Sequence, residues 1–249
     1  MNWLYLSPHL DDAVYSCGGL IAAQVQAGQH VRILTVCAGD PPDAHFSPLA
    51  QTLHARWGTD GFATAAIRRE EDRRACESLG AVWQHADVPD CIYRRSPRGE
   101  PLYTSDEALF GAPAPQEAAL LSRICDLLRT AQAEATRLVV PLTLGGHVDH
   151  RLVRAAAAGL GCPLWFYADY PYARHAIAGE VFALLPAGAR LHRFALDETH
   201  IRQGCAAMAC YASQLTTFWT DETALQNEMH AWTARLGGAL LWETSSVGN

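Results

Sequence analysis

The sequence predicts an α/β protein in which a mostly parallel, Rossmann-like sheet carries helices on both faces. The chain opens with an apolar run at residues 2–6, a stretch of helical length over residues 14–28 and a second apolar run over residues 30–39. Because parallel strands need a crossover between them, this alternation predicts that the two runs are parallel neighbours or near neighbours. With 249 residues, 49% of them hydrophobic and 18% charged, the chain can bury one large core, so we expect a single domain over residues 1–249.

Two long irregular segments interrupt the alternation. Residues 39–62 are rich in Pro, Gly and Asp and are too long for an ordinary connection, which is typical of a loop that shapes a site and holds a short helix. An amphipathic stretch predicts a helix over residues 63–80, and a strand follows at residues 81–88. Residues 90–115 form the second irregular segment.

The rest of the chain returns to regular elements, which we assign from apolar pattern, length and proline position. Helices are predicted at residues 115–134, 150–160, 197–213 and 221–237, and strands at residues 136–142, 190–196 and 239–244, with a strand and an aromatic loop over residues 163–173. No repeat or linker marks a boundary, so residues 190–249 are expected to extend the same domain by strands and helices.

Composition excludes several classes of partner. The net charge is -7 and no Lys/Arg-rich run is present, so we expect no nucleic-acid partner. The longest apolar run, residues 155–168, is broken by glycines and a proline and is shorter than the roughly 20 residues that span a bilayer, which predicts no membrane segment. The start of the chain lacks the pattern of a signal peptide, and eight cysteines without a CxxC pair are typical of a reducing compartment, so a cytoplasmic protein is expected. The oligomeric state is not indicated.

Two turns crowd histidines and carboxylates directly after predicted strands. They are "SPHLDDAVYSCGG", residues 7–19, and "TLGGHVDHRLV", residues 143–153. Ligands of open parallel sheets gather beyond the carboxyl ends of the strands, so these turns are expected to meet. Neighbouring carboxylates raise each other's pKa unless a cation lies between them, and a catalytic zinc site takes three N or O ligands. The candidate residues are His9, Asp11, Asp12, His147, Asp149 and His150.

A plainer interpretation exists for each turn alone. An Asp-Asp pair after a strand is most often a helix N-cap, and two histidines three residues apart at a helix start are more often a hydrogen-bonded surface pair than metal ligands. The occurrence of both turns at equivalent strand ends favours the metal site.

The paired motifs "PHLDD" and "HVDH" resemble the two signatures of the PIG-L/LmbE family of zinc-dependent N-deacetylases. Weaker similarity at "RREEDRRA" and "CYASQ" extends the resemblance over most of residues 3–214. The resemblance implies that Zn²⁺ is held by His9, Asp12 and His150, although N and O ligands also accept Fe²⁺. It implies that Asp11 is the general base, that His147 stabilises the oxyanion and can protonate the leaving amine, and that Asp149 orients His147.

The sequence departs from the family pattern at three positions. Leu10 and Ala13 replace a usual proline and a usual acidic residue, and Gly204 stands where a lysine is often found. None of the three is an implied ligand, so they bear on the subfamily and on the substrate.

The resemblance also implies a substrate class, namely a small N-acetylglucosamine-containing molecule that is hydrolysed to acetate and a free amine. Arg68, Asp90 and Tyr170 are candidate substrate contacts. The alternative for Arg68 is an ion pair with Glu71 on an exposed helix, and the alternative for Tyr170 is structural packing.

Two other functions stay open from the sequence. One is an amidase with the same metal chemistry that cleaves a larger sugar–cysteine conjugate. The other is a non-catalytic sugar- or nucleotide-binding Rossmann module, although the first turn lacks the GxGxxG pattern.

Overall fold

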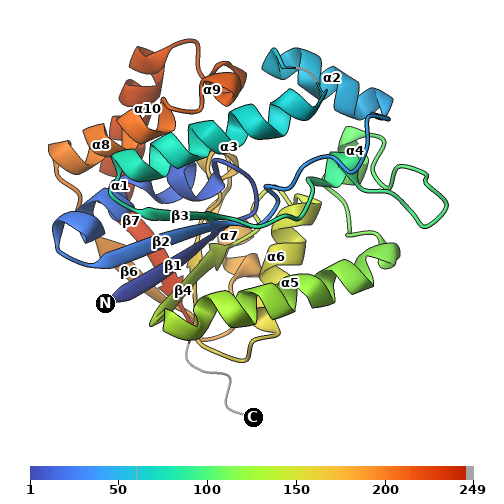
Figure 1. Ribbon diagram of the computed structural model, residues 1–249. Helices are drawn as coiled ribbons and strands as arrows, with labels where there is room; N and C mark the ends of the chain where they lie inside the picture. The colour runs from blue at the N-terminus through green and yellow to red at the C-terminus, as the bar shows by residue number, and fades with distance from the viewer. Residues whose placement is uncertain (60, 245–249) are drawn as a thin grey trace.

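The computed structural model describes residues 1–59 and 61–244 and confirms the predicted α/β class. The described strands form one sheet in the order β3-β2-β1-β4-β5-β7-β6 (Figure 1). They are β1 (Asn2–Ser7), β2 (His30–Thr35), β3 (Val82–His85), β4 (Arg137–Pro141), β5 (Leu164–Tyr167), β6 (Arg190–Phe194) and β7 (Ala239–Glu243). The domain's extent to residue 249 stays a prediction, because residues 245–249 lie outside the described part.

Helices cover both faces of the sheet, as expected (Figure 1). On one face lie α1 (Asp12–Gln26), α3 (Gly61–Ser78), α8 (Glu198–Met208), α9 (Ala212–Phe218) and α10 (Glu222–Leu236). On the other lie α5 (Ala118–Ala131), α6 (Val148–Ala158) and α7 (Ala178–Leu184). The short helices α2 (Pro48–Trp57) and α4 (Asp106–Leu109) belong to the two long irregular segments. No helix within the described ranges combines the length and the apolar character that a bilayer crossing requires.

Strand side chains alternate between two separate cores. In β1, Trp3 and Tyr5 pack in the core under α1 and α3, while Leu4 and Leu6 pack in the core under α5 and α6. Because both faces of the sheet are covered, the central strands are apolar at nearly every position. This explains why the strands appear in the sequence as continuous apolar runs.

The two turns singled out in the sequence follow adjacent central strands. Strand β1 pairs in parallel with β2 on one side and with β4 on the other, with Trp3 opposite Arg137 and Tyr5 opposite Val139. The carboxyl ends of β1 and β4 are therefore side by side, and the turns that follow them meet at one edge of the sheet.

The C-terminal part completes the same sheet with a change of direction. Strand β7 lies between β5 and β6 and is antiparallel to both. The helix predicted over residues 197–213 is two helices, because α8 ends at Met208 and α9 begins at Ala212. The carboxylate of Glu71 accepts hydrogen bonds from the backbone N–H and the Oγ of Ser213, so α9 gains partners for its first turn from α3.

Gly204 has a packing role. A Cβ built at Gly204 would lie 2.6 Å from the backbone nitrogen of Gly19, where α8 crosses α1. Such a distance is far inside van der Waals contact, so the close approach of these helices accounts for a residue without a side chain.

Candidate active site

The β1–α1 turn is held by its own side chains. Ser7 Oγ accepts a hydrogen bond from the backbone N–H of Ala13 at 3.0 Å and donates one to the carbonyl of His9 at 2.6 Å. The backbone N–H of Asp11 bonds the same carbonyl at 3.0 Å. This tight turn places the His9, Asp11 and Asp12 side chains together at the first turn of α1.

The β4–α6 turn depends on two glycines. Gly145 and Gly146 have φ angles of 80° and 76°, a left-handed conformation that side chains other than glycine's disfavour. A Cβ on Gly145 would also lie 2.6 Å from the ring of Tyr172. The turn delivers His147 as the N-cap of α6, with His150 one turn further along the helix.

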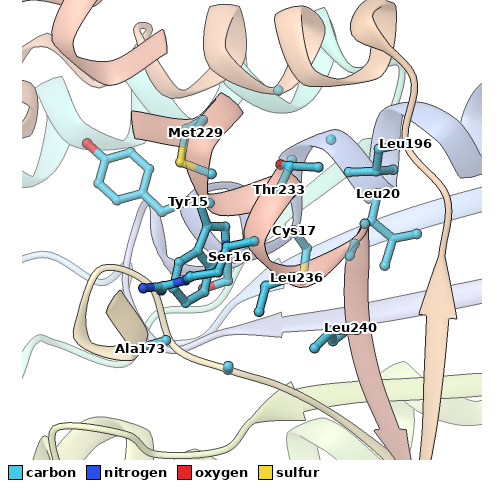
Figure 2. Close-up of a pocket in the computed structure, with 18 of the residues that line it drawn as sticks. Tyr15, Ser16, Cys17, Leu20, Ala173, Leu196, Met229, Thr233, Leu236 and Leu240 are labelled. Atoms are coloured by element: carbon cyan, nitrogen blue, oxygen red, sulfur yellow. The ribbon is translucent and has the colours of Figure 1, made fainter. Parts of the chain in front are cut away.

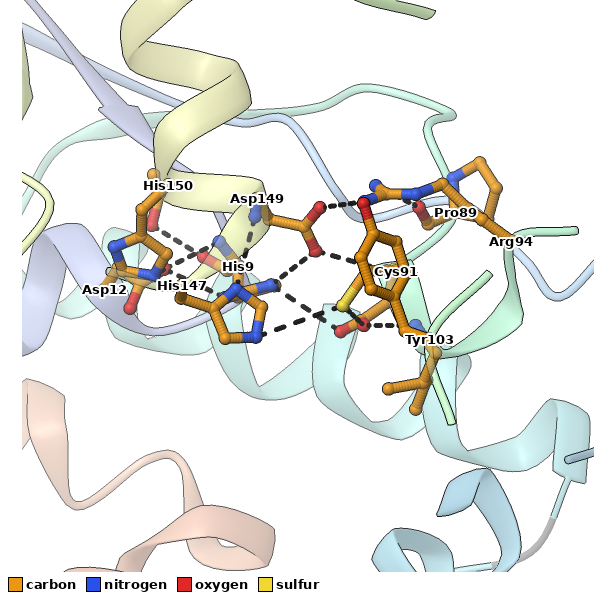
Figure 3. Close-up of polar contacts among 12 residues, drawn as sticks. His9, Asp12, Pro89, Cys91, Arg94, Tyr103, His147, Asp149 and His150 are labelled. Atoms are coloured by element: carbon orange, nitrogen blue, oxygen red, sulfur yellow. Dashed lines mark hydrogen bonds and ion pairs between the residues drawn. The ribbon is translucent and has the colours of Figure 1, made fainter. Parts of the chain in front are cut away.

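Donors from the two turns meet at the Asp12 carboxylate (Figure 3). Asp12 Oδ2 lies 3.3 Å from His9 Nδ1 and 3.2 Å from His150 Nε2. Asp12 and His150 are buried and His9 is nearly so. Two imidazole nitrogens and one carboxylate oxygen are a donor set that fits a divalent cation such as zinc and leaves a further coordination position open.

His150 has a buried partner that the sequence reasoning missed. Its Nδ1 lies 2.7 Å from Asp169 Oδ1, and the other oxygen of Asp169 accepts from the backbone N–H of Leu144 at 2.9 Å. A carboxylate at Nδ1 fixes the ring orientation and leaves Nε2 free to bind a metal. The available signal was an aspartate directly after strand β5, at the same sheet edge as the two turns.

Asp11 lies beside the donor set in a buried ion pair. Burial raises the pKa of Asp11 to about 7, while the Arg68 guanidinium, whose NH2 lies 3.2 Å from Asp11 Oδ2, opposes that rise. Arg68 also lies over the ring of Trp57, with 5.1 Å between the guanidinium carbon and the ring centroid. A carboxylate with a pKa near neutrality is suited to accept and return a proton.

His147 is held as a neutral ring. Burial, with a contribution from His9, lowers the pKa of His147 to about 3. The backbone N–H of Asp149 donates to His147 Nδ1 at 3.3 Å, which leaves the ring hydrogen on Nε2. The rings of His9, His147 and His150 each offer one nitrogen within 4.8 Å of the others, so the His147 N–H lies close to the donor set.

The Asp149 carboxylate does not contact His147 as the resemblance implied. It lies 2.9 Å from His9 Nε2, accepts from the backbone N–H of Cys91 at 3.1 Å and pairs with Arg94 at 2.5 Å (Figure 3). Asp149 orients His147 through its backbone and His9 through its side chain. The partners of the carboxylate, Arg94, His9 and Cys91, come from other segments, so it has no hydrogen bond left for the His147 ring.

Comparisons with known proteins identify the family. The family model described as "PIG-L: GlcNAc-PI de-N-acetylase" matches residues 4–160. The chain belongs to the PIG-L family. It is 32% identical to the 2'-N-acetylparomamine deacetylase of Streptomyces fradiae over 98% of this chain and 82% of that one. It is 31% identical to the 2'-N-acetylparomamine deacetylase of Niallia circulans over 68% of this chain and 67% of that one.

Solved PIG-L-like structures share the fold over almost the whole chain. The zinc-inhibited form of the teicoplanin deacetylase Orf2 is 29% identical with a TM-score of 0.80, covering 98% of this chain and 97% of that one. The A40926 pseudoaglycone deacetylase Dbv21 is 29% identical with a TM-score of 0.77, covering 99% and 98%. This PIG-L protein is an N-deacetylase.

Other groups of donors overlap the two turns. Cys91, His147 and Asp149 offer ligand atoms within 4.8 Å of one another, as do His9, Asp90 and Asp149, and His9, His147 and His150. Cys91 Sγ lies 3.9 Å from His147 Nε2, and burial raises the pKa of its thiol well above the usual value.

Arg94, which the sequence reasoning also missed, joins two buried carboxylates. It pairs with Asp149 and with Glu117 at 2.5 Å each, and its guanidinium lies over the ring of Tyr103. Arg94, Asp149 and Glu117 are all buried. The long segment between β3 and α5 thus supplies the charge that holds Asp149 against His9.

We expect Arg94→Met to lower the free energy of unfolding of this PIG-L domain by about 3–5 kcal/mol, because two buried carboxylates lose their cation. Arg94→Lys restores the charge but not the forked geometry and is expected to recover part of the loss. Urea denaturation of the two variants measures this, with the exposed Arg98→Met as the matched control. Equal stability of Arg94→Met and wild type would contradict the structural role.

The predicted substrate contacts have different surroundings. Arg68 and Asp90 line a small hollow with Leu10, and Asp90 Oδ2 lies 3.8 Å from His9 Nε2, so both are at the site and their contact with substrate stays a prediction. The exposed Arg68–Glu71 pair is wrong, since Arg68 binds Asp11 and Glu71 binds Ser213.

Tyr170 is wrong as a substrate-facing residue. It is 2% exposed, stacks on Trp219 and donates its hydroxyl to Glu228, because the chain turns it into the core under α10. The tyrosine near the donor set is Tyr172, whose ring centroid lies 6.2 Å from that of His150.

Tyr170→Phe is therefore expected to leave KM unchanged and to lower the free energy of unfolding by about 1 kcal/mol through the lost hydrogen bond. Steady-state kinetics and urea denaturation measure both quantities. A rise in KM with unchanged stability would return Tyr170 to the substrate site.

Proposed function

We propose that this protein removes the acetyl group from the amino sugar of a small N-acetylglucosamine-containing molecule and releases acetate and a free amine. The observation that carries the proposal is the contact of Asp12 with both His9 and His150, with Asp11 next to Asp12 in the sequence and paired to a buried arginine. The relatives named above act on N-acetylparomamine and on teicoplanin-type antibiotics, which supports an acylated amino sugar as the substrate class.

The metal is assigned to His9, Asp12 and His150. Zn²⁺ fits these N and O donors, and Fe²⁺ is accepted by the same atoms. A bound divalent cation polarises the acyl carbonyl and lowers the pKa of a coordinated water toward about 7. Asp169 keeps the His150 ring in position for this, and Asp149 does the same for His9.

Asp11 is the proton carrier in the proposed reaction. Its carboxylate accepts a proton from the attacking water, and Arg68 holds the side chain in place through the ion pair. When the C–N bond breaks, the same proton goes to the leaving nitrogen, so the amine departs neutral. The resemblance gave this second step to His147, but burial lowers the pKa of its ring to about 3, so the neutral ring lacks the second ring proton that an imidazolium acid would transfer.

His147 is assigned to the oxyanion. The ring hydrogen is on Nε2, because Nδ1 already accepts from the backbone N–H of Asp149, and Nε2 has only the long 3.9 Å contact with Cys91 Sγ. A donor fixed before the reaction in a buried site stabilises a developing negative charge strongly. His147 therefore needs no positive charge for this role.

A panel of substrates tests the proposal. The metal-loaded protein is incubated with N-acetylglucosamine derivatives, sugar conjugates and N-acetylated peptides, and the free amine and acetate are quantified by mass spectrometry. Amine and acetate in equal amounts from sugars alone is the expected result. Deacetylation of peptides but of no sugar would overturn the substrate class, and cleavage at a bond other than the acetyl amide would favour the conjugate amidase.

The cytoplasmic placement is kept as part of the proposal. It is supported by the eight cysteines, each of which is a free thiol in the structure. The oligomeric state carries no assignment.

A further inference from the structure

A second hollow lies beyond the proposed metal ligands, farther along α1. It has a volume of about 410 Å³ and lies between α1, α7, α8, α10 and the strands β6 and β7 (Figure 2). Ligand sites in proteins typically measure about 300–1,000 Å³, so the cavity is large enough for a small molecule. None of the six candidate residues of the two turns lines it.

The lining of the cavity is mostly apolar. Side chains from α1, α10 and β7 line the cavity (Figure 2). They include the sulfur-containing residues Cys17 on α1 and Met229 on α10. The lining includes Leu20, Cys17, Met229, Leu236, Leu240 and Trp242. A chamber of this kind offers few partners for polar groups, so the part of a ligand that enters it must be hydrocarbon.

The mouth of the cavity is also apolar and faces solvent. Phe182 on α7 is 69% exposed and Leu191 on β6 is 50% exposed, and both line the cavity. Ile177, directly before α7, is 69% exposed. Two large apolar side chains of the lining are therefore exposed to solvent, and exposed apolar side chains beside a mostly apolar cavity are typical of a binding site for an apolar group.

The lining of the cavity includes one charged side chain. Arg235, in the last turn of α10, is the charged side chain among the lining residues, and its guanidinium carbon lies 4.5 Å above the centroid of the Trp232 ring. Across residues 1–59 and 61–244, no carboxylate forms an ion pair with it. A cation held on an aromatic ring beside a hydrocarbon chamber complements an anion attached to an alkyl chain.

We propose that this cavity binds an alkyl chain that ends in a carboxylate, with the chain inside the chamber and the carboxylate at Arg235. The acyl chain of a larger molecule carries no charge at its end, and the experiment below distinguishes it from a free fatty acid. The proposal does not rest on the deacetylase function, because none of the six candidate residues of the two turns lines the cavity, although residues 15–19 of the first turn do.

Calorimetric titration of the metal-loaded protein tests the proposal with three twelve-carbon probes, each below its micelle concentration. They are dodecanoate, dodecyltrimethylammonium and a neutral dodecyl glycoside. We expect one dodecanoate per chain and a Kd at least tenfold lower than that of the cationic probe. Excess acetate is expected to leave this binding unchanged, since acetate has no chain for the chamber. Loss of binding in acetate would place dodecanoate at the metal and overturn the proposal.

Two pairs of variants locate the chain and its head group. Ala176→Trp fills the half-buried entrance and is expected to weaken dodecanoate at least tenfold, whereas Ala133→Trp on the surface is not. Arg235→Gln is expected to remove the preference for the anion, whereas Arg202→Gln on exposed α8 surface keeps it.

Thermal melting accompanies each titration. If Ala176→Trp melts at a lower temperature than wild type, Val181→Trp on α7 replaces it as the variant that fills the entrance. Arg235→Gln is expected to melt at the wild-type temperature, because Arg235 is exposed. Undetectable dodecanoate binding, or equal Kd values for the anionic and cationic probes, would overturn the proposal. Equal affinity for dodecanoate and the neutral glycoside would overturn the carboxylate assignment and point to the chain of an acylated molecule.

Discussion

Replacement of Asp11 by asparagine is expected to lower kcat by about 10²–10⁴-fold, the usual contribution of a general base, while the metal content stays at the wild-type level. An amide cannot accept the proton of the attacking water, whereas Asp12 keeps its contacts with His9 and His150. Steady-state kinetics and elemental analysis of the same preparation measure the two quantities together.

The control for this variant is Asp87→Asn, which changes an exposed carboxylate away from the two turns in the same way. Arg68 loses a charged partner in Asp11→Asn, so urea denaturation is measured alongside to separate lost stability from lost chemistry. Turnover near the wild-type rate by a metal-loaded, stable Asp11→Asn protein would exclude Asp11 as the base.

Replacement of His150 by alanine is expected to lower metal affinity by more than about 100-fold, with loss of turnover. Loss of a residue that only hydrogen-bonds a metal ligand commonly lowers metal affinity about 10–100-fold, so loss of a ligand itself is expected to lower it further. Asp169→Asn, which keeps the His150 ring but weakens its support at Nδ1, is expected to fall within that smaller range. Metal titration monitored by calorimetry ranks the two variants.

His30→Ala removes an exposed imidazole at the start of β2 and serves as the matched control. The ligand assignment predicts that metal affinity is highest in wild type and His30→Ala, lower in Asp169→Asn and lowest in His150→Ala. Metal content of His150→Ala equal to that of wild type would remove His150 from the ligand set.

The sequence by itself determined the elements that lie within one turn of the chain. The apolar runs, the glycine after the first helix and the position of Pro115 predicted the α/β alternation, which the structure confirms. The motifs after β1 and β4 also identified the candidate residues, because a strand end and the helix start that follows it are separated by only a few residues. Local hydrogen bonds, such as those of Ser7, then position the side chains.

Partners from distant segments were decided by the tertiary structure alone. Arg94 reaches Asp149 from the long segment between β3 and α5, and Arg68 reaches Asp11 from α3 across 57 residues. Spacing in a sequence describes which residues share a helix face, and it therefore suggested Arg68 with Glu71. A buried charge instead pairs with whichever opposite charge the packing of other elements brings to it.

The direction of side chains in irregular segments was likewise decided only in three dimensions. Tyr170 and Tyr172 are two residues apart, yet Tyr170 packs on Trp219 in the core and Tyr172 lies near His150. A helix or strand has a fixed period that assigns each residue to a face, whereas the aromatic loop after β5 has none. Its path is set by the helix and strands that it packs against, and those contacts exist only once the chain has folded.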